Sequence, residues 1–289
     1  MRSLPANLLG RAVREALRED IGPGDLTCVA VVPAGATARG IIQARQPLVV
    51  AGLEAARLAF LETDPRAAVS LVAPSGAEVP VGTVLLNVVG EATGILSAER
   101  TALNFLGRLS GIATLTRRCV RLVAGTRAQI YDTRKTTPGL RLLEKHAVAV
   151  GGGRNHRIGL FDDVLIKDNH LPLAGGPGAA VKAARARYGP SMCIEIEVSD
   201  LDALEEALAA GADIVLLDNM DVGMMREAAA RVSRRFAGAA RRPLLEASGG
   251  ITLENLRAVA ETGVDRISMG MLTHSAPAAD VSLALSPLP

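Results

Sequence analysis

The chain of 289 residues predicts an α/β protein: an incomplete seven-stranded βα barrel that follows an N-terminal α+β sandwich domain. From Ala128 onward, short apolar runs alternate with helical stretches, which is the order that builds a parallel sheet. Residues 35–50 and 68–90 are instead rich in Val, Ile and Thr between Gly and Pro, which is typical of antiparallel strands. The hydrophobic fraction of 49% is ample for a core of this size. We expect domains at 1–115 and 116–275 and a tail at 276–289.

The N-terminal domain is predicted to begin with a helix over residues 6–19, whose Leu8, Leu9, Val13 and Leu17 share one face. The string EDIGPGDLT ends this helix, and its Asp25 could cap a turn or bind a ligand. A short helix, EAARLAFLE, separates the two strand regions. Residues 96–123 read as helical, and we expect a break near Gly111.

Seven apolar runs are candidate strands of the second domain: AQIY, AVAV, DVLI, MCIEIEV, DIVLL, PLLEA and RISM. Between the later runs, Ser199 and Thr252 stand where helix N-caps belong, and Gly211 and Gly263 where C-caps belong. An open doubly wound sheet is the competing architecture. Polar residues at strand ends favour the barrel, because one mouth would gather them all.

Composition excludes several functions. A net charge of +2 argues against nucleic acid as the main partner. The three cysteines, Cys28, Cys119 and Cys193, have no spacing typical of zinc or a redox pair, and we expect small buried hydrophobes in a reducing cytosol. We expect no signal peptide and no membrane helix, since no apolar run reaches about 20 residues. The predicted location is therefore cytoplasmic.

Positive charge is concentrated between Arg134 and Arg157, where six Lys/Arg and two His accompany a single acid, Glu144. Three glycines, at 151–153, allow the backbone to approach a ligand closely. Asp132 and Lys167 each end an apolar run, where a charge is costly unless it is paired or used. The stretch therefore predicts a site for a small anion.

Other strand ends carry further candidates. Glu197 and Asp218 could form a glycosidase-like pair, hold a hard cation such as Mg²⁺, or pair with Lys135 or Lys167. Glycine turns at 248–250 and 269–271 follow the last two strands, the usual place for a phosphate cradle. Of the histidines, His156 is the best functional candidate. His170 could close a turn, His274 could hold the last loop, and His146 is expected to be structural.

The strings DTRKTTPGLRLLEKHAV, GGGRNHRIGL and LIKDNH closely resemble the signature of the quinolinate phosphoribosyltransferase family. EIEV, LLDNM, EASGGI and SMGMLTHS continue the match, so that the resemblance covers nearly the whole chain. It implies transfer of the phosphoribosyl group of phosphoribosyl pyrophosphate (PRPP) to quinolinate with decarboxylation, giving nicotinate mononucleotide, CO₂ and pyrophosphate for NAD synthesis. It also implies a requirement for Mg²⁺ and a homodimer.

The resemblance assigns roles to residues at matching positions. Arg100 would come from the neighbouring subunit. The expected substrate-binding residues in the barrel are Thr133, Arg134, Lys135, His156, Arg157 and Lys167. The expected catalytic residues are Glu197, Asp218, Lys135 and Lys167, the two acids also handling the metal. The expected phosphate-binding residues are Ser248, Gly249, Gly250, Met269, Gly270 and Met271. His146 and Ala149 depart from the family pattern at positions not expected to be catalytic.

Three alternatives remain open from the sequence. A related phosphoribosyltransferase could use another aromatic acid such as nicotinate, although one carboxylate would not need so many cations. A barrel aldolase could use Lys167 as a Schiff-base nucleophile. A dinucleotide-binding module without activity is disfavoured, because no GxGxxG follows a strand.

Overall fold

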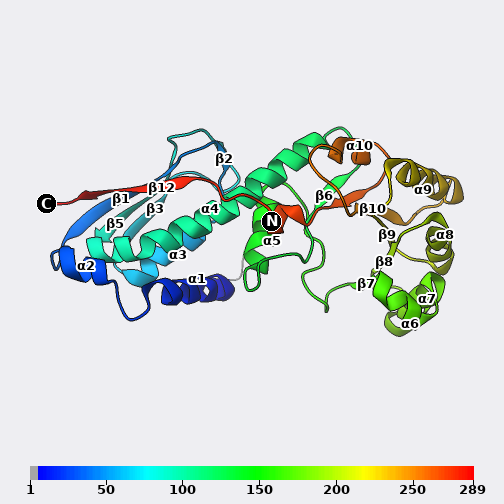
Figure 1. Cartoon of the computed structure of the whole chain (residues 1–289), viewed down its shortest axis with the longest axis horizontal. Coiled ribbons are helices and arrows are strands. Elements are labelled where there is room, and N and C mark those ends of the chain that lie inside the picture. Colours follow the sequence, from blue (N-terminus) through cyan, green and yellow to red (C-terminus); the bar gives the residue numbers. More distant parts are fainter. Residues whose placement is uncertain (1–5) are drawn as a thin grey trace. The chain divides into compact units, whose positions relative to one another are not determined.

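The computed structural model of the chain describes residues 6–289, which form two compact units. The first contains the residues up to Arg117, together with Thr136–Gly152 and Met271–Pro289. The second contains Arg118–Lys135 and Gly153–Gly270. No helix within residues 6–289 is long and apolar enough to cross a membrane. The elements of both units are labelled in Figure 1.

The first unit is built on a four-stranded antiparallel sheet in the order β12-β1-β5-β3. Its strands are β1 (Thr37–Ala44), β3 (Ala68–Leu71), β5 (Val84–Glu91) and β12 (Val281–Pro287). A separate pair joins β2 (Leu48–Val49) to β4 (Glu78–Val79). The segment predicted to be a tail therefore supplies an edge strand, which pairs with β1 over seven residues.

Helices complete the first unit: α1 (Ala6–Ile21), α2 (Leu26–Val31), α3 (Leu53–Thr63), α4 (Ala92–Leu122), α5 (Arg141–Val150) and α11 (Met271–His274). α1 agrees with the prediction except that Leu8 is exposed. Asp25 acts as the N-cap of α2, a helix that the sequence did not predict, by accepting a hydrogen bond from the N–H of Cys28.

The break expected near Gly111 is wrong, because α4 runs without interruption through that residue. A Cβ atom at Gly111 would lie 2.0 Å from the carbonyl oxygen of Pro277. The glycine therefore allows two backbones of the first unit to approach closely, and it does not interrupt the helix.

The second unit contains a six-stranded parallel sheet in the order β6-β11-β10-β9-β8-β7. The strands are β6 (Gln129–Tyr131), β7 (Val164–Ile166), β8 (Ile194–Val198), β9 (Ile214–Asp218), β10 (Leu244–Ser248) and β11 (Arg266–Ser268). Between them lie η1 (Asp168–His170), α6 (Leu171–Ala174), α7 (Pro177–Tyr188), α8 (Leu201–Ala210), α9 (Val222–Arg235) and α10 (Leu256–Ala260). α7, α8 and α9 pack side by side along the strands (Figure 1).

One of the seven predicted strands, AVAV, is wrong, since residues 147–150 end helix α5. This helix is buried on most of its circumference, so its apolar run cannot be distinguished from a strand by pattern alone. The position beside β6 is taken by Arg154, which forms a parallel bridge with Tyr131. The predicted N-caps are also corrected: Asp200 caps α8 and Asn255 precedes α10, while Gly211 does end α8.

Candidate active site

Three polar side chains meet at the carboxyl ends of β8, β9 and β10. Asp218 and Ser248 are direct partners in the parallel register, and Glu197 pairs with Leu216, two residues before Asp218. Paired residues of parallel strands point to the same face, so these three side chains share one face of the sheet. Glu197 and Asp218 also line a common cavity of about 350 Å³.

The cavity is strongly acidic. Its other lining residues include four more acids, Asp168, Asp200, Asp202 and Glu206. Lys167 provides a countercharge, since its Nζ lies 3.0 Å from Oε2 of Glu197. The lysine side chain is 47% exposed and the glutamate only 12%. The pairing between Glu197 and Lys167 that the sequence allowed is therefore present, and it leaves Asp218 available to a cation.

The loop after β10 is tightly constrained by the loop after β9. Gly249 has φ +86°, and a Cβ atom there would lie 2.3 Å from Oδ1 of Asn219. Asn219 itself has φ +53°, the only positive value at a non-glycine residue within residues 6–289. Its N–H donates to the carbonyl of Ser248, and its Nδ2 donates to Asp218. Such backbone strain is typical of functional sites.

The basic segment 153–157 is held beside β6 by Asp132. This acid is fully buried and accepts hydrogen bonds from Nδ2 of Asn155 at 2.6 Å and from the N–H of His156 at 2.8 Å. The N–H of Arg154 donates to the carbonyl of Ile130 at 2.7 Å. The charge at the end of this strand is thus paired, and it fixes the backbone that carries His156 and the residue after it.

Arg157 is a buried cation with incomplete hydrogen bonding. Only 8% of the residue is exposed, and its Nη1 donates to the carbonyl of Asp163 at 3.2 Å. Its Nε is buried and has no hydrogen-bond partner. Burial lowers the pKa of the guanidinium, and the charge of Arg134 lowers it further. Two neighbouring cations, one of them buried with an unused N–H, favour an anionic ligand.

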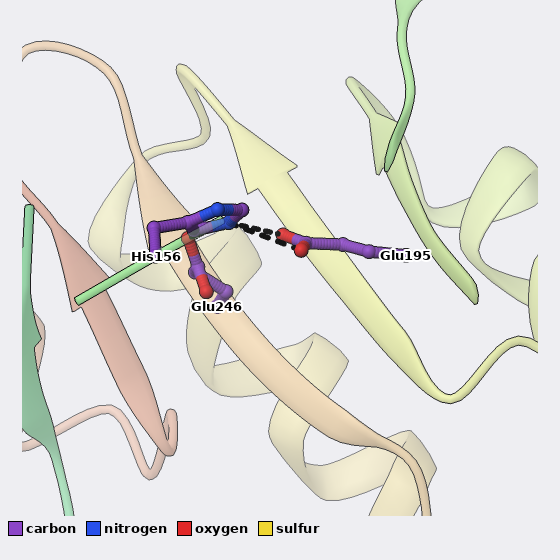
Figure 2. A group of neighbouring side chains, drawn as sticks. All are labelled: His156, Glu195 and Glu246. Atoms are coloured by element: carbon purple, nitrogen blue, oxygen red, sulfur yellow. Dashed lines mark hydrogen bonds and ion pairs between the residues drawn. The ribbon is translucent and has the colours of Figure 1, made fainter. Parts of the chain in front are cut away.

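His156 lies among buried acids, as Figure 2 shows. Its Nε2 is 3.0 Å from Oε2 of Glu195 and 3.5 Å from Oε1 of Glu246. Its Nδ1 accepts a hydrogen bond of 2.8 Å from the N–H of Arg157. Both ring nitrogens are therefore engaged within the protein.

The same three side chains are close enough to share an ion, because one ligand atom from each lies within 4.8 Å of the others. A guanidinium nitrogen of Arg266 is already 3.8 Å from Glu246, so a divalent cation would be placed beside a positive charge. The acid-lined cavity is better suited to Mg²⁺, which needs only one or two carboxylates together with substrate phosphates.

Comparison with known proteins identifies the family of the chain. Residues 25–110 match the family described as quinolinate phosphoribosyl transferase, N-terminal domain, and residues 112–284 match the C-terminal domain of the same family. The chain belongs to the quinolinate phosphoribosyltransferase family.

Relatives resemble the chain over almost their full length. The nicotinate-nucleotide pyrophosphorylase [carboxylating] of Mycobacterium leprae is 45% identical over 94% of this chain and 95% of its own. The probable enzyme of the same name from Bacillus subtilis is 42% identical over 92% and 89%. The solved structure of nicotinate-nucleotide pyrophosphorylase from Francisella tularensis is 37% identical, covers 98% of both chains and has a TM-score of 0.91.

The residues expected from this family lie in different parts of the fold. The second unit contains Thr133, Arg134, Lys135, His156, Arg157, Lys167, Glu197, Asp218 and Ser248 to Gly250, together with Met269 and Gly270. Arg100 is an exposed residue of α4 in the first unit, and Met271 begins α11 there. The hydroxyl of Thr133 accepts a hydrogen bond from the N–H of Lys135, which shapes the turn after β6.

The helices that follow the expected phosphate-binding loops are short, so their dipoles are weak. α10 has five residues and begins only at Leu256, and α11 has four. Any phosphate would therefore depend on the backbone N–H groups of the glycine turns more than on a helix dipole.

The sequence predicts no role for Glu195, which is set aside in favour of Glu197, or for Glu246. Strand alternation could have found them, because each lies two residues before a predicted site residue, Glu197 or Ser248. His170 is confirmed as a turn residue, since its Nδ1 accepts from the N–H of Lys167 at 2.8 Å.

Proposed function

We infer that this chain is a quinolinate phosphoribosyltransferase that forms nicotinate mononucleotide, CO₂ and pyrophosphate from quinolinate and PRPP in NAD biosynthesis. The observation that carries the assignment is Arg157, a buried guanidinium with an unpartnered Nε and Arg134 as a neighbour. A planar carboxylate can accept from such a group, and quinolinate offers two carboxylates. Relatives named for this reaction cover nearly the whole chain.

Binding of quinolinate would place its carboxylates against Arg134, Arg157 and the lysines. A fork-shaped guanidinium can bind a carboxylate in bidentate fashion, whereas Lys135 and Lys167 act as point charges. We expect discrimination against nicotinate because a single carboxylate leaves part of this positive charge uncompensated. A desolvated cation without its partner is costly.

The first chemical step joins the pyridine nitrogen to the anomeric carbon as the bond to pyrophosphate breaks. The sugar develops positive charge, which the carboxylates of Glu197 and Asp218 can stabilise. In the second step the bond from C2 to its carboxylate breaks and the electron pair remains on C2, beside the positive ring nitrogen. A proton then bonds to C2 in place of the lost CO₂.

Glu197 and Asp218 would also hold Mg²⁺, because both line the acidic cavity at the ends of β8 and β9. The ion would offset the charge of pyrophosphate as it leaves. The ammonium group of Lys167, 3.0 Å from Glu197, keeps that acid oriented before substrate arrives. The turns at 248–250 and 269–271 would bind the 5′-phosphate through their backbone.

A homodimer is part of this proposal, because the resemblance implies that Arg100 completes the site of the neighbouring subunit. The exposed position of Arg100 on α4 is compatible with that role.

The function is tested by offering quinolinate and nicotinate separately, each with PRPP and Mg²⁺, and measuring nucleotide and CO₂. We expect nicotinate mononucleotide and equimolar CO₂ from quinolinate, and negligible product from nicotinate. Equal or faster turnover of nicotinate without CO₂ release would overturn the assignment. Covalent trapping of a carbonyl substrate on Lys167 by borohydride would favour an aldolase. We do not expect it, because Schiff-base lysines are usually desolvated or placed beside cations, whereas Lys167 is half exposed and ion-paired.

The roles of the two acids give a second test. We expect Glu197→Gln and Asp218→Asn to lower turnover by at least about a hundredfold, since each removes charge that acts in the transition state. Quinolinate affinity, measured by calorimetry, should change less than turnover, because the two acids act chiefly on the sugar and pyrophosphate, although Glu197 also contacts the carboxylate-binding Lys167. Full activity in excess chelator, or a collapse of quinolinate affinity with normal turnover at saturation, would contradict these roles.

A further inference from the structure

Two buried acids lie on the same face of the sheet as the candidate site. Glu195 is two residues before Glu197 on β8, and Glu246 is two residues before Ser248 on β10. Because side chains alternate along a strand, each acid points to the same face as the site residue that follows it. Glu195 is 3% exposed and Glu246 is fully buried.

Apolar residues occupy most of the paired positions beside these acids, except that Arg266 of β11 pairs with Glu246. Leu165 of β7 pairs with Glu195, and Leu216 of β9 pairs with Glu246. Layers inside such a sheet are normally filled by bulky apolar side chains. Burying two carboxylates there carries a large desolvation cost unless they are paired. Packing alone does not explain why glutamates stand where leucine would fit.

Their common partner is the imidazole of His156. Since Nδ1 accepts the N–H of Arg157, the ring proton is on Nε2, which lies 3.0 Å and 3.3 Å from the two carboxylate oxygens of Glu195. Glu246 approaches the same nitrogen to 3.5 Å. Glu195 therefore fixes one tautomer and one orientation of the ring through this hydrogen bond, whereas Glu246 is a close acidic neighbour that makes no hydrogen bond to it.

The orientation of the His156 ring affects the position of Arg157, the proposed substrate-binding cation. Nδ1 of His156 is the hydrogen-bond acceptor for the backbone N–H of Arg157, the residue whose buried Nε is unpartnered. From the other side, Asp132 holds the N–H of His156. These two hydrogen bonds fix the backbone on both sides of His156, and they thereby set the direction of the Arg157 side chain.

Arg266 is a positively charged neighbour of Glu246. It lies 3.8 Å from Glu246 and its guanidinium stacks 4.7 Å above the ring of Tyr131. His156 and Arg266 offset part of the acidic charge, although the carboxylate oxygens of Glu246 have no hydrogen-bond partner among the described residues.

We propose that Glu195 and Glu246 are positioning residues for quinolinate: they clamp His156 and so hold Arg157 in place to bind a substrate carboxylate. This inference rests on the proposed function. His156 acts as the linking group between the acids and Arg157, which modifies the expectation that it contacts the substrate directly.

The experiment compares Glu195→Leu, Glu195→Gln and Glu246→Leu with the wild-type enzyme. In Glu195→Leu the KM for quinolinate should rise at least about tenfold, as expected for loss of a buried charged hydrogen bond. In Glu246→Leu it should rise by less, because Glu246 makes no hydrogen bond to the ring. In both variants the KM for PRPP should stay within about twofold. Glu195→Gln keeps an acceptor for Nε2–H and should recover part of the loss. Asp213→Asn is the control, because this acid holds Arg185 at the opposite end of the sheet, and it should lower the Tm alone.

A second readout reports the clamp directly. The ¹⁵N chemical shifts of the His156 ring, assigned with His156→Gln, should show a single Nε2–H tautomer in the wild type and a tautomer mixture in Glu195→Leu. If the leucine variants fail to fold, Glu195→Gln and its ring shifts decide the question.

Three results would overturn the proposal: an unchanged quinolinate KM in folded Glu195→Leu, equal increases in both KM values, or a stoichiometric metal ion that Glu246→Gln loses. Failure of the proposed function looks different, because wild-type enzyme would then make no nicotinate mononucleotide from quinolinate.

Discussion

Among the residues in and around the candidate site, Glu246 has a markedly raised pKa. Burial raises its pKa to about 7, and the neighbouring charge of Glu195 acts in the same direction. His156, Ser268 and Arg266 oppose the shift without cancelling it. The folded protein therefore keeps a proton on this carboxyl at a pH where an exposed glutamate has lost it.

The proton on Glu246 predicts a pH dependence of stability. In the unfolded chain this acid titrates near its ordinary value of 4.5, and in the folded protein at about 7. Between these values the unfolded state binds fewer protons, so the contribution of Glu246 to the free energy of unfolding falls as pH rises, and it levels off above the folded pKa. We expect wild-type stability to fall relative to Glu246→Gln between pH 5 and pH 7.5, as measured by urea unfolding.

The comparison with Glu246→Gln removes the titrating groups distant from Glu246 from the difference, because the two proteins share them. Glu195 and His156 interact with Glu246 and contribute to the difference with it. A constant gap in unfolding free energy from pH 5 to pH 8 would mean that Glu246 does not hold a proton in this window. A gap that grows in favour of the wild type would mean that its pKa is lowered.

At the scale of elements, the loops after β9 and β10 form one constrained unit. Gly249 meets both conditions that exclude a side chain: a positive φ and a close neighbour, Asn219. Asn219 in turn is bonded to Ser248 and Asp218. A change at Gly249 should therefore disturb the proposed PRPP site and the turn together.

We expect Gly249→Ala to raise the KM for PRPP at least about tenfold and to cost about 1–3 kcal/mol of stability, because the new Cβ must displace Asn219. Gly238→Ala is a matched control: its φ is +79°, and nothing lies within 4 Å of an added Cβ. It should show the backbone penalty without the loss of PRPP affinity. Equal KM values in the two variants would indicate that the turn does not bind the co-substrate.

Most elements could be predicted from the sequence because their signals are local. Strands such as DIVLL are short apolar runs with polar residues at the end, and Gly211 ends α8 as its position indicated. The failures concern residues whose environment depends on distant segments. AVAV is apolar because α5 is surrounded by protein, and Gly111 is glycine because of Pro277, 166 positions later.

The sequence indicates candidate residues at the strand ends but not the buried acids that precede them. Lys167, Glu197 and Asp218 follow apolar runs, which marks them as strand-end residues. Glu195 and Glu246 stand inside runs, and nothing local shows that His156 lies opposite both of them. The contacts between β8, β10 and the segment 153–157 arise only when the second unit is folded.

At the scale of the whole molecule, the expected substrate-binding residues belong to different units. Arg100 is in the first unit and Lys135 in the second. Membership in the quinolinate phosphoribosyltransferase family leads us to propose that Arg100 serves the second unit of a partner subunit. A two-fold dimer would then contain two equivalent sites, each made from both chains.

This arrangement predicts that two inactive variants can restore each other. Arg100→Ala and Lys135→Ala should each be nearly inactive alone. In a mixed dimer, one site would contain both substitutions and the other neither, so unfolding and refolding a 1:1 mixture should restore about a quarter of wild-type sites under random pairing. Arg134→Ala mixed with Lys135→Ala is the control: both residues follow β6 of the same chain, so every mixed site has one defect and activity stays low. If mass-tagged subunits exchange and the Arg100 mixture remains as inactive as its parents, Arg100 does not act across the dimer.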